Sequence, residues 1–364
     1  MRMFFNRVKR TLVCMVLALG VVGCSKAPDP QNDIPLFKAF IAENIDKVSD
    51  DPYISSTVKP GDKMYEFLVE LQHGMVRKET YEPMIEQGDS ESKLWYARLS
   101  MYETPIVGQV YQWIKEAMLE GNPYAALELS EQGEFCETYG KGSASSKLLE
   151  MMGSDTSYES KICSTENFAK AVEGFEKLAK QGDLRAQYFL LKQKEWDKSE
   201  ETRADYIQEI IRFSEAHYYQ PLMDYVETIL YYSKEAQKDV SNTQEQYDLA
   251  IQLLTVASNN NYIPAINQLF LSISDEEYKK ELANKSITLG DTQMLVFQFY
   301  SVERNSKEQY YYNLLFKELT GQYKSTRVET PNESSKVEAQ AKAFAKTIHS
   351  SVYIDGFTDS GDWI

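Results

Sequence analysis

The side chains with the strongest catalytic and metal-binding chemistry are sparse in this sequence. The histidines are His73, His217 and His349, and none has a second ligand at the spacing of a metal site. The HExxH, GxSxG, GxxxxGK(S/T) and GxGxxG patterns are absent. The acidic run Asp275–Glu277 lacks the alternating oxygens and the glycine of a calcium loop. We therefore expect no metal, no cofactor and no enzymatic activity.

One enzymatic alternative stays open. Lytic transglycosylases combine a helical superhelix with a catalytic glutamate, which lies in an ES motif followed by a Gly-Leu-Met-Gln run. The ES pairs of this sequence begin at Glu91, Glu159 and Glu333, and no such run follows them. The sequence therefore favours a binding protein over an enzyme of this class.

The N-terminus has the pattern of an export signal. Residues 1–10 carry four basic and no acidic side chains, and the apolar stretch 11–22 follows. This stretch is shorter than the roughly 20 apolar residues of a spanning helix. The sequence VVGC at 21–24 resembles the lipobox of bacterial lipoproteins, which implies removal of the signal peptide 1–23 and acylation of Cys24. The alternative is an ordinary secretory signal with a chance cysteine.

Acylation implies a lasting membrane anchor, because two or three acyl chains hold a protein durably where one holds it only marginally. Residues 24–32 then form the lipidated cysteine and a linker that contains two prolines. Ser25, rather than an aspartate, follows Cys24. This resembles the sorting signal that directs lipoproteins to the outer membrane. We expect a protein anchored by lipid to the periplasmic face of the outer membrane.

The charge of the chain restricts its partners. The net charge is -16, and removal of residues 1–23, with four basic and no acidic side chains, makes it -20. Such a body repels nucleic acid and anionic lipid headgroups. We therefore expect no nucleic acid as a partner, and another protein with a basic surface instead.

Two cysteines remain in the exported body. Cys14 leaves with the signal peptide, so Cys136 and Cys163 are left in an oxidising compartment. A disulfide between them would stabilise the fold by about 3–4 kcal/mol on the chain-entropy model. The alternative is a pair of buried thiols.

A pattern of two amphipathic helices joined by a short turn recurs along residues 76–323. In its clearest copy, 171–191, apolar residues three and four apart form one helix face, Gly182 closes the helix, and the small Ala186 opens the packing face of the next. A single pair cannot bury its face alone, so neighbouring pairs stack. The predicted turns lie at Gly88, Gly121, Gly182, Tyr218, Asn261 and Gly290. The longest interval, 121–182, contains an insertion with both body cysteines.

The run LAKQGDLRAQYFL at 178–190 resembles the Sel1-like subclass of tetratricopeptide-type repeats. The resemblance implies an all-α fold, an α-solenoid of antiparallel helix pairs. We expect capping helices in 33–75 before the array, and a C-terminal helix and tail in 324–364 after it. The last residues, 352–364, are either a loose end or a strip packed on the last repeat.

A solenoid presents an extended surface on which aromatic side chains anchor another protein. The tyrosine clusters are candidates for this contact: Tyr218, Tyr219, Tyr231, Tyr232, Tyr310, Tyr311 and Tyr312. Some Sel1-like lipoproteins resemble immunity proteins, which occlude a type VI secretion effector, often a phospholipase. We expect this function here, and a scaffold or regulator of cell-wall or outer-membrane machinery is the alternative.

Overall fold

The structure is a computed structural model, and it describes residues 28–55, 58–74, 83–86, 88–102, 106–235 and 243–355. Within these ranges the regular structure is helical, apart from an isolated parallel bridge between Ile54 and Val352. The all-α fold class is confirmed. The signal peptide and Cys24 lie outside the described residues.

The helices have the following bounds. The order is η1 (Pro30–Asp33), α2 (Ile34–Asn44), α3 (Lys63–Gln72), α5 (Ser90–Leu99), α6 (Val107–Leu119), α7 (Pro123–Glu128), α8 (Glu134–Tyr139), α9 (Ala144–Met151), η3 (Ser157–Ser160), α10 (Thr165–Lys180) and α11 (Leu184–Gln193). It continues with η4 (Trp196–Lys198), α12 (Arg203–Glu215), α13 (Gln220–Glu235), α14 (Gln244–Asn259), α15 (Ile263–Ser272), α16 (Glu276–Thr288), α17 (Thr292–Ser301), α18 (Lys307–Thr320) and α19 (Ser334–Ala345).

The turns between paired helices share one local chemistry. A residue in the left-handed conformation ends the first helix, and an Asp or Asn side chain usually caps the second. At Gly182 φ is +95°, and the side chain of Asp183 then accepts a hydrogen bond from the amide of Ala186. The same conformation occurs at Gly88, Gly121, Asn261 and Gly290. The turn predicted near Tyr218 has His217 in this position, at φ +57°.

From α5 to α19, consecutive helices pack on one another, α11 and α12 through η4, with one interruption. The helix α10 packs on α7, whereas α8 packs on α9, so residues 134–163 form an excursion between the two halves of a continuous row. A disulfide joins Cys136, on α8, to Cys163, which directly precedes the cap of α10. The disulfide therefore closes the base of the insertion that the repeat spacing predicted.

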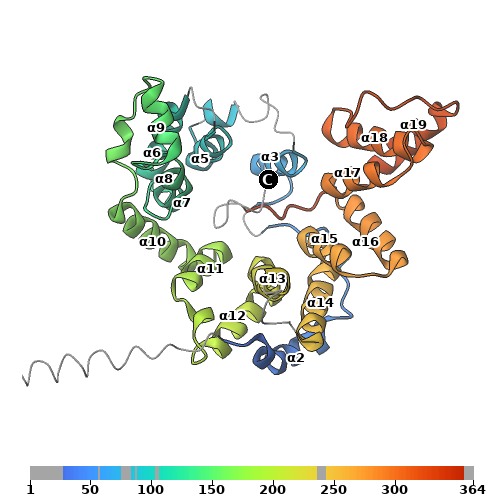
Figure 1. The fold of residues 1–364 in the computed structure, drawn as a ribbon, viewed down its shortest axis with the longest axis horizontal. Coiled ribbons are helices and arrows are strands. Elements are labelled where there is room, and N and C mark those ends of the chain that lie inside the picture. Colours follow the sequence, from blue (N-terminus) through green and yellow to red (C-terminus); the bar gives the residue numbers. More distant parts are fainter. Residues whose placement is uncertain are drawn as a thin grey trace, which may run out of the picture.

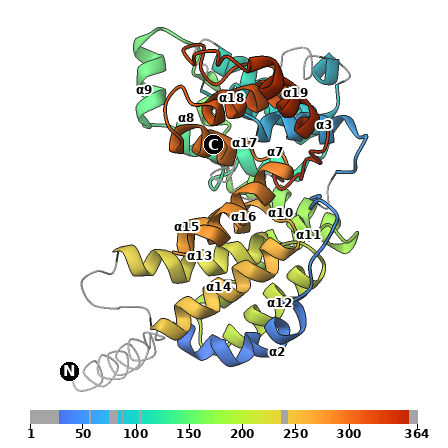
Figure 2. The ribbon, with the colours of Figure 1, turned by 90° about the vertical axis from the view of Figure 1, so that its right-hand side faces the viewer.

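The helices curve around the middle of the molecule, where the C-terminal segment lies (Figure 1). The second helices of successive pairs, α11, α13 and α15, lie nearer the middle than their partners. Two arms rise from this row, one with α5 to α9 and the other with α17 to α19, and α3 lies between them. Figure 2 shows α2 at the end of the molecule opposite to these arms.

The segment 33–75 does not act as one cap at the start of the array. Its first helix, α2, packs against α12 and α14 in the middle of the chain order. Its second helix, α3, contacts the first repeat, since the rings of Phe67 and Trp95 lie 5.8 Å apart. The long loop between the two helices allows them to lie apart. Each helix buries its apolar face against a different part of the helical row.

Two large hydrophobic cores support the fold. One is built mainly from α2 and α12 to α17, and the other from α3, α5 to α8, α10 and α11. Near the C-terminus, Val352 and Ile354 are buried in the second core, and Tyr353 packs against both. This alternation is that of an extended strand, whose successive side chains point to opposite sides. The C-terminal segment thus bridges the two cores.

A candidate binding cleft between the two arms

The inner side of the helical row is covered by the chain itself. Tyr218 and Tyr219 are 1 % and 2 % exposed. The ring of Tyr53, from the loop after α2, lies 5.9 Å from that of Tyr219 and 4.9 Å from that of Tyr262. The prediction that Tyr218 and Tyr219 anchor a partner is therefore wrong, because tyrosines at these turns pack under an internal segment.

Three of the other predicted tyrosines, Tyr310, Tyr311 and Tyr312, lie on α18, in the second arm. Tyr310, on α18, is buried, and its hydroxyl donates to Glu338 of α19 at 3.1 Å. Tyr311 and Tyr312 are half-buried and pack against the first core. The side chains of Tyr231 and Tyr232, like Cys24, lie outside the described residues. None of the described tyrosines of this set offers a fully exposed ring.

The segment Ile348–Asp355, which we call the C-terminal strip, fills the middle of the molecule through backbone hydrogen bonds. The amide of Ser55 donates to the carbonyl of Val352 at 2.7 Å, and the amide of Val352 donates to that of Tyr53 at 2.9 Å. On the other side, the amide of Ser351 donates to the carbonyl of Leu289 at 3.0 Å. The strip is therefore held between the loop after α2 and the turn before α17.

The side chain of Gln72 makes hydrogen bonds to the backbone of this strip, as a neighbouring strand would. The amide nitrogen of Gln72, at the end of α3, donates to the carbonyl of Ser351 at 2.7 Å. Its oxygen accepts from the amides of Tyr353 and Ile354 at 2.8 and 3.1 Å. The sequence leaves open whether the tail is a loose end or a strip packed on the last repeat. Its described part is a packed strip, but it lies in the middle of the molecule rather than on the last repeat.

The strip ends in a buried polar cluster. The Arg185 guanidinium donates to the carbonyl oxygen of Asp355 at 3.2 Å and lies over the ring of Tyr124 at 5.0 Å. Burial raises the pKa of the Asp355 carboxyl to about 6, although the positive charge of Arg185 opposes this shift. These contacts tie the end of the strip to α11.

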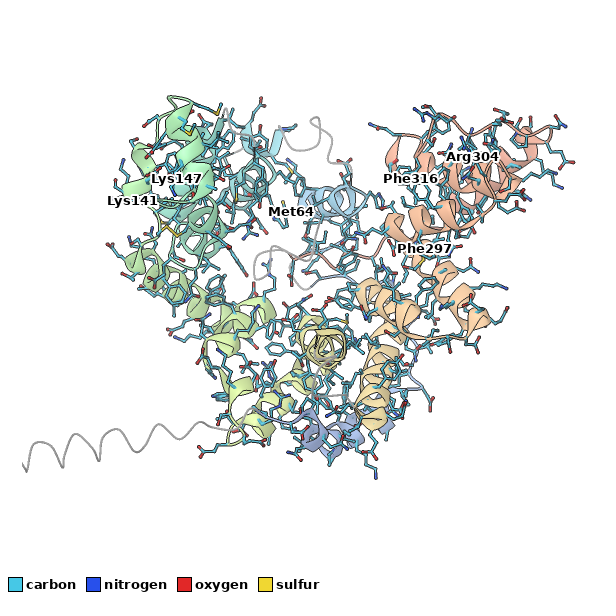
Figure 3. The ribbon with its side chains drawn as sticks, viewed as in Figure 1. Met64, Lys141, Lys147, Phe297, Arg304 and Phe316 are labelled. Carbon is cyan, nitrogen blue, oxygen red and sulfur yellow. A yellow bond between two sulfur atoms is a disulfide. The ribbon has the colours of Figure 1, made fainter. Side chains whose placement is uncertain are left out.

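A cavity of about 860 Å³ opens between the two arms, and we call it the inter-arm cleft. Its back is the end of α3 with the strip, one wall is the end of α5 with the start of α8, and the other is α17, α18 and the turn after α18. Its main lining side chains are Leu71, Gln72, His73, Arg98, Leu99, Tyr102, Glu134, Gln293, Val296, Phe316, Gln322, Tyr323, Lys324, Tyr353 and Ile354. Figure 3 shows Phe316 on the arm that carries α18.

The wall on the first arm is stiffened by ionic hydrogen bonds. Arg98 and Glu128 are buried, and the Arg98 Nε donates to the Glu128 carboxylate at 2.6 Å. The other oxygen of this carboxylate accepts from the amide of Phe135 at 3.2 Å. At the rim, Tyr102 is 61 % exposed and donates to Glu134 at 2.6 Å. This hydrogen bond, with partial burial, raises the pKa of Tyr102 to about 12.

The wall on the second arm combines aromatic rings with lysines. Lys317 donates to the hydroxyl of Tyr323 at 2.9 Å, and its ammonium lies 4.2 Å from the ring centre. Lys324 lies over the ring of Phe316 at 5.8 Å. Since Tyr323 is 43 % exposed, each wall of the cleft presents one accessible tyrosine. These rings can take part in apolar contacts and hydrogen bonds with the same ligand.

The three histidines have different surroundings. His73 lies at the back of the cleft, where burial lowers its pKa and contacts with the backbone of Gly290 and Leu319 oppose this shift. His73 and the exposed His349 also line a second cavity of about 720 Å³. His217 takes the left-handed turn position before α13. Among the described residues, no three His, Cys, Asp or Glu side chains could hold a metal ion.

The glutamates of the three ES pairs lie on different elements. Glu91 is in the first turn of α5, and burial raises its pKa, with Arg185 opposing the shift. Glu159, in η3, accepts from the hydroxyl of Ser146. Glu333 precedes α19 and pairs with Lys307 at 2.8 Å. None of the three lines the inter-arm cleft.

The sequence interpretation missed the residues of the cleft. Tyr102 follows α5, and Tyr323 follows α18, so both lie where a helix has ended and no repeat position is expected. The signal that could have found them is an aromatic residue placed directly after an amphipathic helix, where nothing in the repeat pattern buries it. Which two helix ends face each other depends on the curvature of the row.

Comparison of this chain with protein families, with curated proteins and with solved structures gave no match. None of the described helices combines the length and the apolar character needed to cross a bilayer.

Proposed function

We propose that the chain is a lipoprotein, anchored through Cys24 to the periplasmic face of the outer membrane, that binds another protein in the inter-arm cleft. The proposed architecture is an α-solenoid of Sel1-like helix pairs. The support for it is the recurring turn, in which a left-handed residue precedes a capped helix, together with the packing of each helix on its neighbours.

The observation that carries the proposal is the composition of the cleft. Tyr102 and Tyr323 expose rings on opposite walls, and Leu99, Val296 and Phe316 add apolar surface between them. Exposed amides come from Gln293 and Gln322. A protein segment with apolar side chains can bury them here while its backbone bonds to the amides.

In its most concrete form, the proposal is that the chain is an immunity protein for a phospholipase-like effector of a type VI secretion system. Inhibition requires only a complementary surface, which can block an active site without any chemistry of its own. A cleft with two facing walls can enclose a protruding loop of such an effector. The acidic body, with a net charge of -16 for the full sequence, favours a basic effector surface.

The test is co-expression with the product of the neighbouring gene, directed to the periplasm. We expect this product to be toxic alone and harmless beside the intact chain. Tyr102→Ala combined with Tyr323→Ala should abolish protection, because a buried aromatic anchor contributes about 2 kcal/mol or more, a roughly 30-fold change in affinity. Tyr300→Ala is the matched control, since Tyr300 is 68 % exposed on α17 but does not line the cleft.

Two results would contradict this proposal, the first its immunity role and the second its binding site. A neighbouring product that is harmless without the chain would remove the immunity role. Full protection by the double variant, with a toxic neighbour, would keep the immunity role but exclude the inter-arm cleft as its site.

A further inference from the structure

The start of the described chain is fixed to the body at its first residues. Asp29 accepts hydrogen bonds from the amide of Gln31 at 3.0 Å and from the side chain of Gln246 at 3.2 Å. The hydroxyl of Thr243, at the start of α14, donates to the side chain of Gln31 at 2.7 Å. Residues 29–31 are therefore held against the first turn of α14.

A buried ion pair fixes the next turn more firmly. The Asp33 carboxylate is fully buried, and it accepts from Arg203 Nε at 3.0 Å and from Nη2 at 2.7 Å. The hydroxyl of Tyr225 donates to the same carboxylate at 2.9 Å. The guanidinium also lies 5.4 Å from the centre of the Tyr225 ring. The N-terminal segment is thus bonded to α12 and α13 as well as to α14.

These contacts leave a short connection to the proposed acylation site. Five residue steps separate Cys24 from Asp29. At no more than about 3.4 Å per residue, they span at most about 17 Å. A compact body of this length measures about 50 Å across. The connection is therefore far shorter than the body, and the far end of the protein cannot turn toward the bilayer that holds the acyl groups.

The fixed end and the cleft lie at opposite ends of the molecule. In Figures 1 and 2 alike, α2 is at one end, and α9, α18 and α19 are at the other. The cleft belongs to the second end, because its walls are α5, α8, α17 and α18. Lys141 and Lys147 are on the arm that carries α9 (Figure 3).

The charge of the fixed end does not favour adhesion to a bilayer. Across η1, α2 and the start of α14, the exposed acidic side chains outnumber the exposed basic Lys38: they are Asp29, Glu43, Glu245 and Asp248. Carboxylates at this position repel anionic headgroups. The short connection, and not an electrostatic contact, must therefore keep this end beside the membrane.

We infer that the lipid anchor holds the protein in one orientation, with η1, α2 and the start of α14 facing the bilayer and the inter-arm cleft facing the periplasm. This inference rests on the proposed acylation of Cys24. Its consequence is that the partner approaches from the periplasm and need not enter the bilayer. The helix α9, on which Met151 is 85 % exposed, also lies at the end away from the anchoring membrane.

The test uses the acylated protein, which begins at Cys24, in neutral lipid vesicles, with its acyl groups verified by mass. One variant carries a dye on Gln244→Cys at the fixed end, and another on Leu148→Cys on α9; both positions are exposed. The vesicles carry a headgroup acceptor. We expect energy transfer from position 244 to exceed that from position 148 severalfold. A Gly-Ser insert of about 20 residues between Ala27 and Pro28 should reduce this difference.

The outcomes separate the orientation from the anchor. Equal transfer from the two positions of an acylated protein would overturn the orientation and leave the anchor intact. A chain without acyl groups would overturn both the anchor and the orientation. Binding of Cys24→Ser to anionic vesicles would contradict the inference as well, because the fixed end would then adhere by charge.

Discussion

The Asp33–Arg203 pair offers a quantitative test of the structure, through the variant Asp33→Asn. The carboxylate is fully buried, and its partners are the Arg203 guanidinium and the hydroxyl of Tyr225. The amide of asparagine keeps the shape but removes the negative charge, so Arg203 is left as an uncompensated buried cation. Loss of one partner of a buried ion pair costs about 3–5 kcal/mol of folding free energy.

This loss can be converted into a change in melting temperature. Unfolding entropy is about 2.1 cal/mol/K per residue, so a body of about 340 residues gives about 0.7 kcal/mol/K. The expected decrease in melting temperature is therefore about 4–7 °C. The measurement is calorimetric unfolding of the protein without its signal peptide, at neutral pH.

The matched control is Glu209→Gln, also next to an arginine of α12. The pair Glu209–Arg212 is 33 % and 43 % exposed, and such surface pairs contribute no more than about 1 kcal/mol. We expect a decrease of less than about 2 °C for this control. If Asp33→Asn lowered the melting temperature no further than Glu209→Gln does, the burial of this pair and the fixed N-terminal segment would be refuted.

Three further predictions concern the strip, the disulfide and a buried acid. Gln72→Ala should cost about 2–3 kcal/mol and accelerate amide hydrogen exchange in the strip, unlike Gln293→Ala; equal exchange in the two variants would contradict the contacts of Gln72. Reduction of Cys136–Cys163 should lower the unfolding free energy in urea titrations by about 3–4 kcal/mol, and no change would contradict a stabilising role. Asp355 has a pKa raised to about 6 in the folded state, above its ordinary value, so its destabilising effect grows as pH rises from about 4 to about 6. Asp355→Asn should therefore stabilise the protein at pH 7 but not below pH 4, and a benefit that is independent of pH would contradict this.

Local chemistry made the helices and most of the turns predictable from the sequence. Gly182 followed by Asp183 specifies a left-handed residue and then a helix cap, and the structure has both. The turn near Tyr218 was misplaced by one residue, because a histidine takes the position that glycine usually takes. Histidine adopts this conformation more often than most residues other than glycine, but the sequence alone does not distinguish His217 from its neighbours at this turn.

Long-range contacts made the rest unpredictable. Tyr218 and Tyr219 have the composition of a binding surface, and only the path of residues 51–55 and of the strip shows that they are covered. The strip itself is set by pairings such as Gln72 with Tyr353, which are separated by 281 residues. The cleft depends in the same way on how the two arms come to face each other. Amphipathic periodicity carries no information on such pairings.

The most direct test of the account is amide hydrogen exchange of the anchored protein with and without its captured partner. We predict slower exchange in residues 98–102, 293–296 and 316–324, which form the two walls of the inter-arm cleft. Exchange in α10 and α12, on the outer side of the row, should not change. Slower exchange confined to α10 and α12, with unchanged cleft walls, would contradict the claim that the cleft binds the partner.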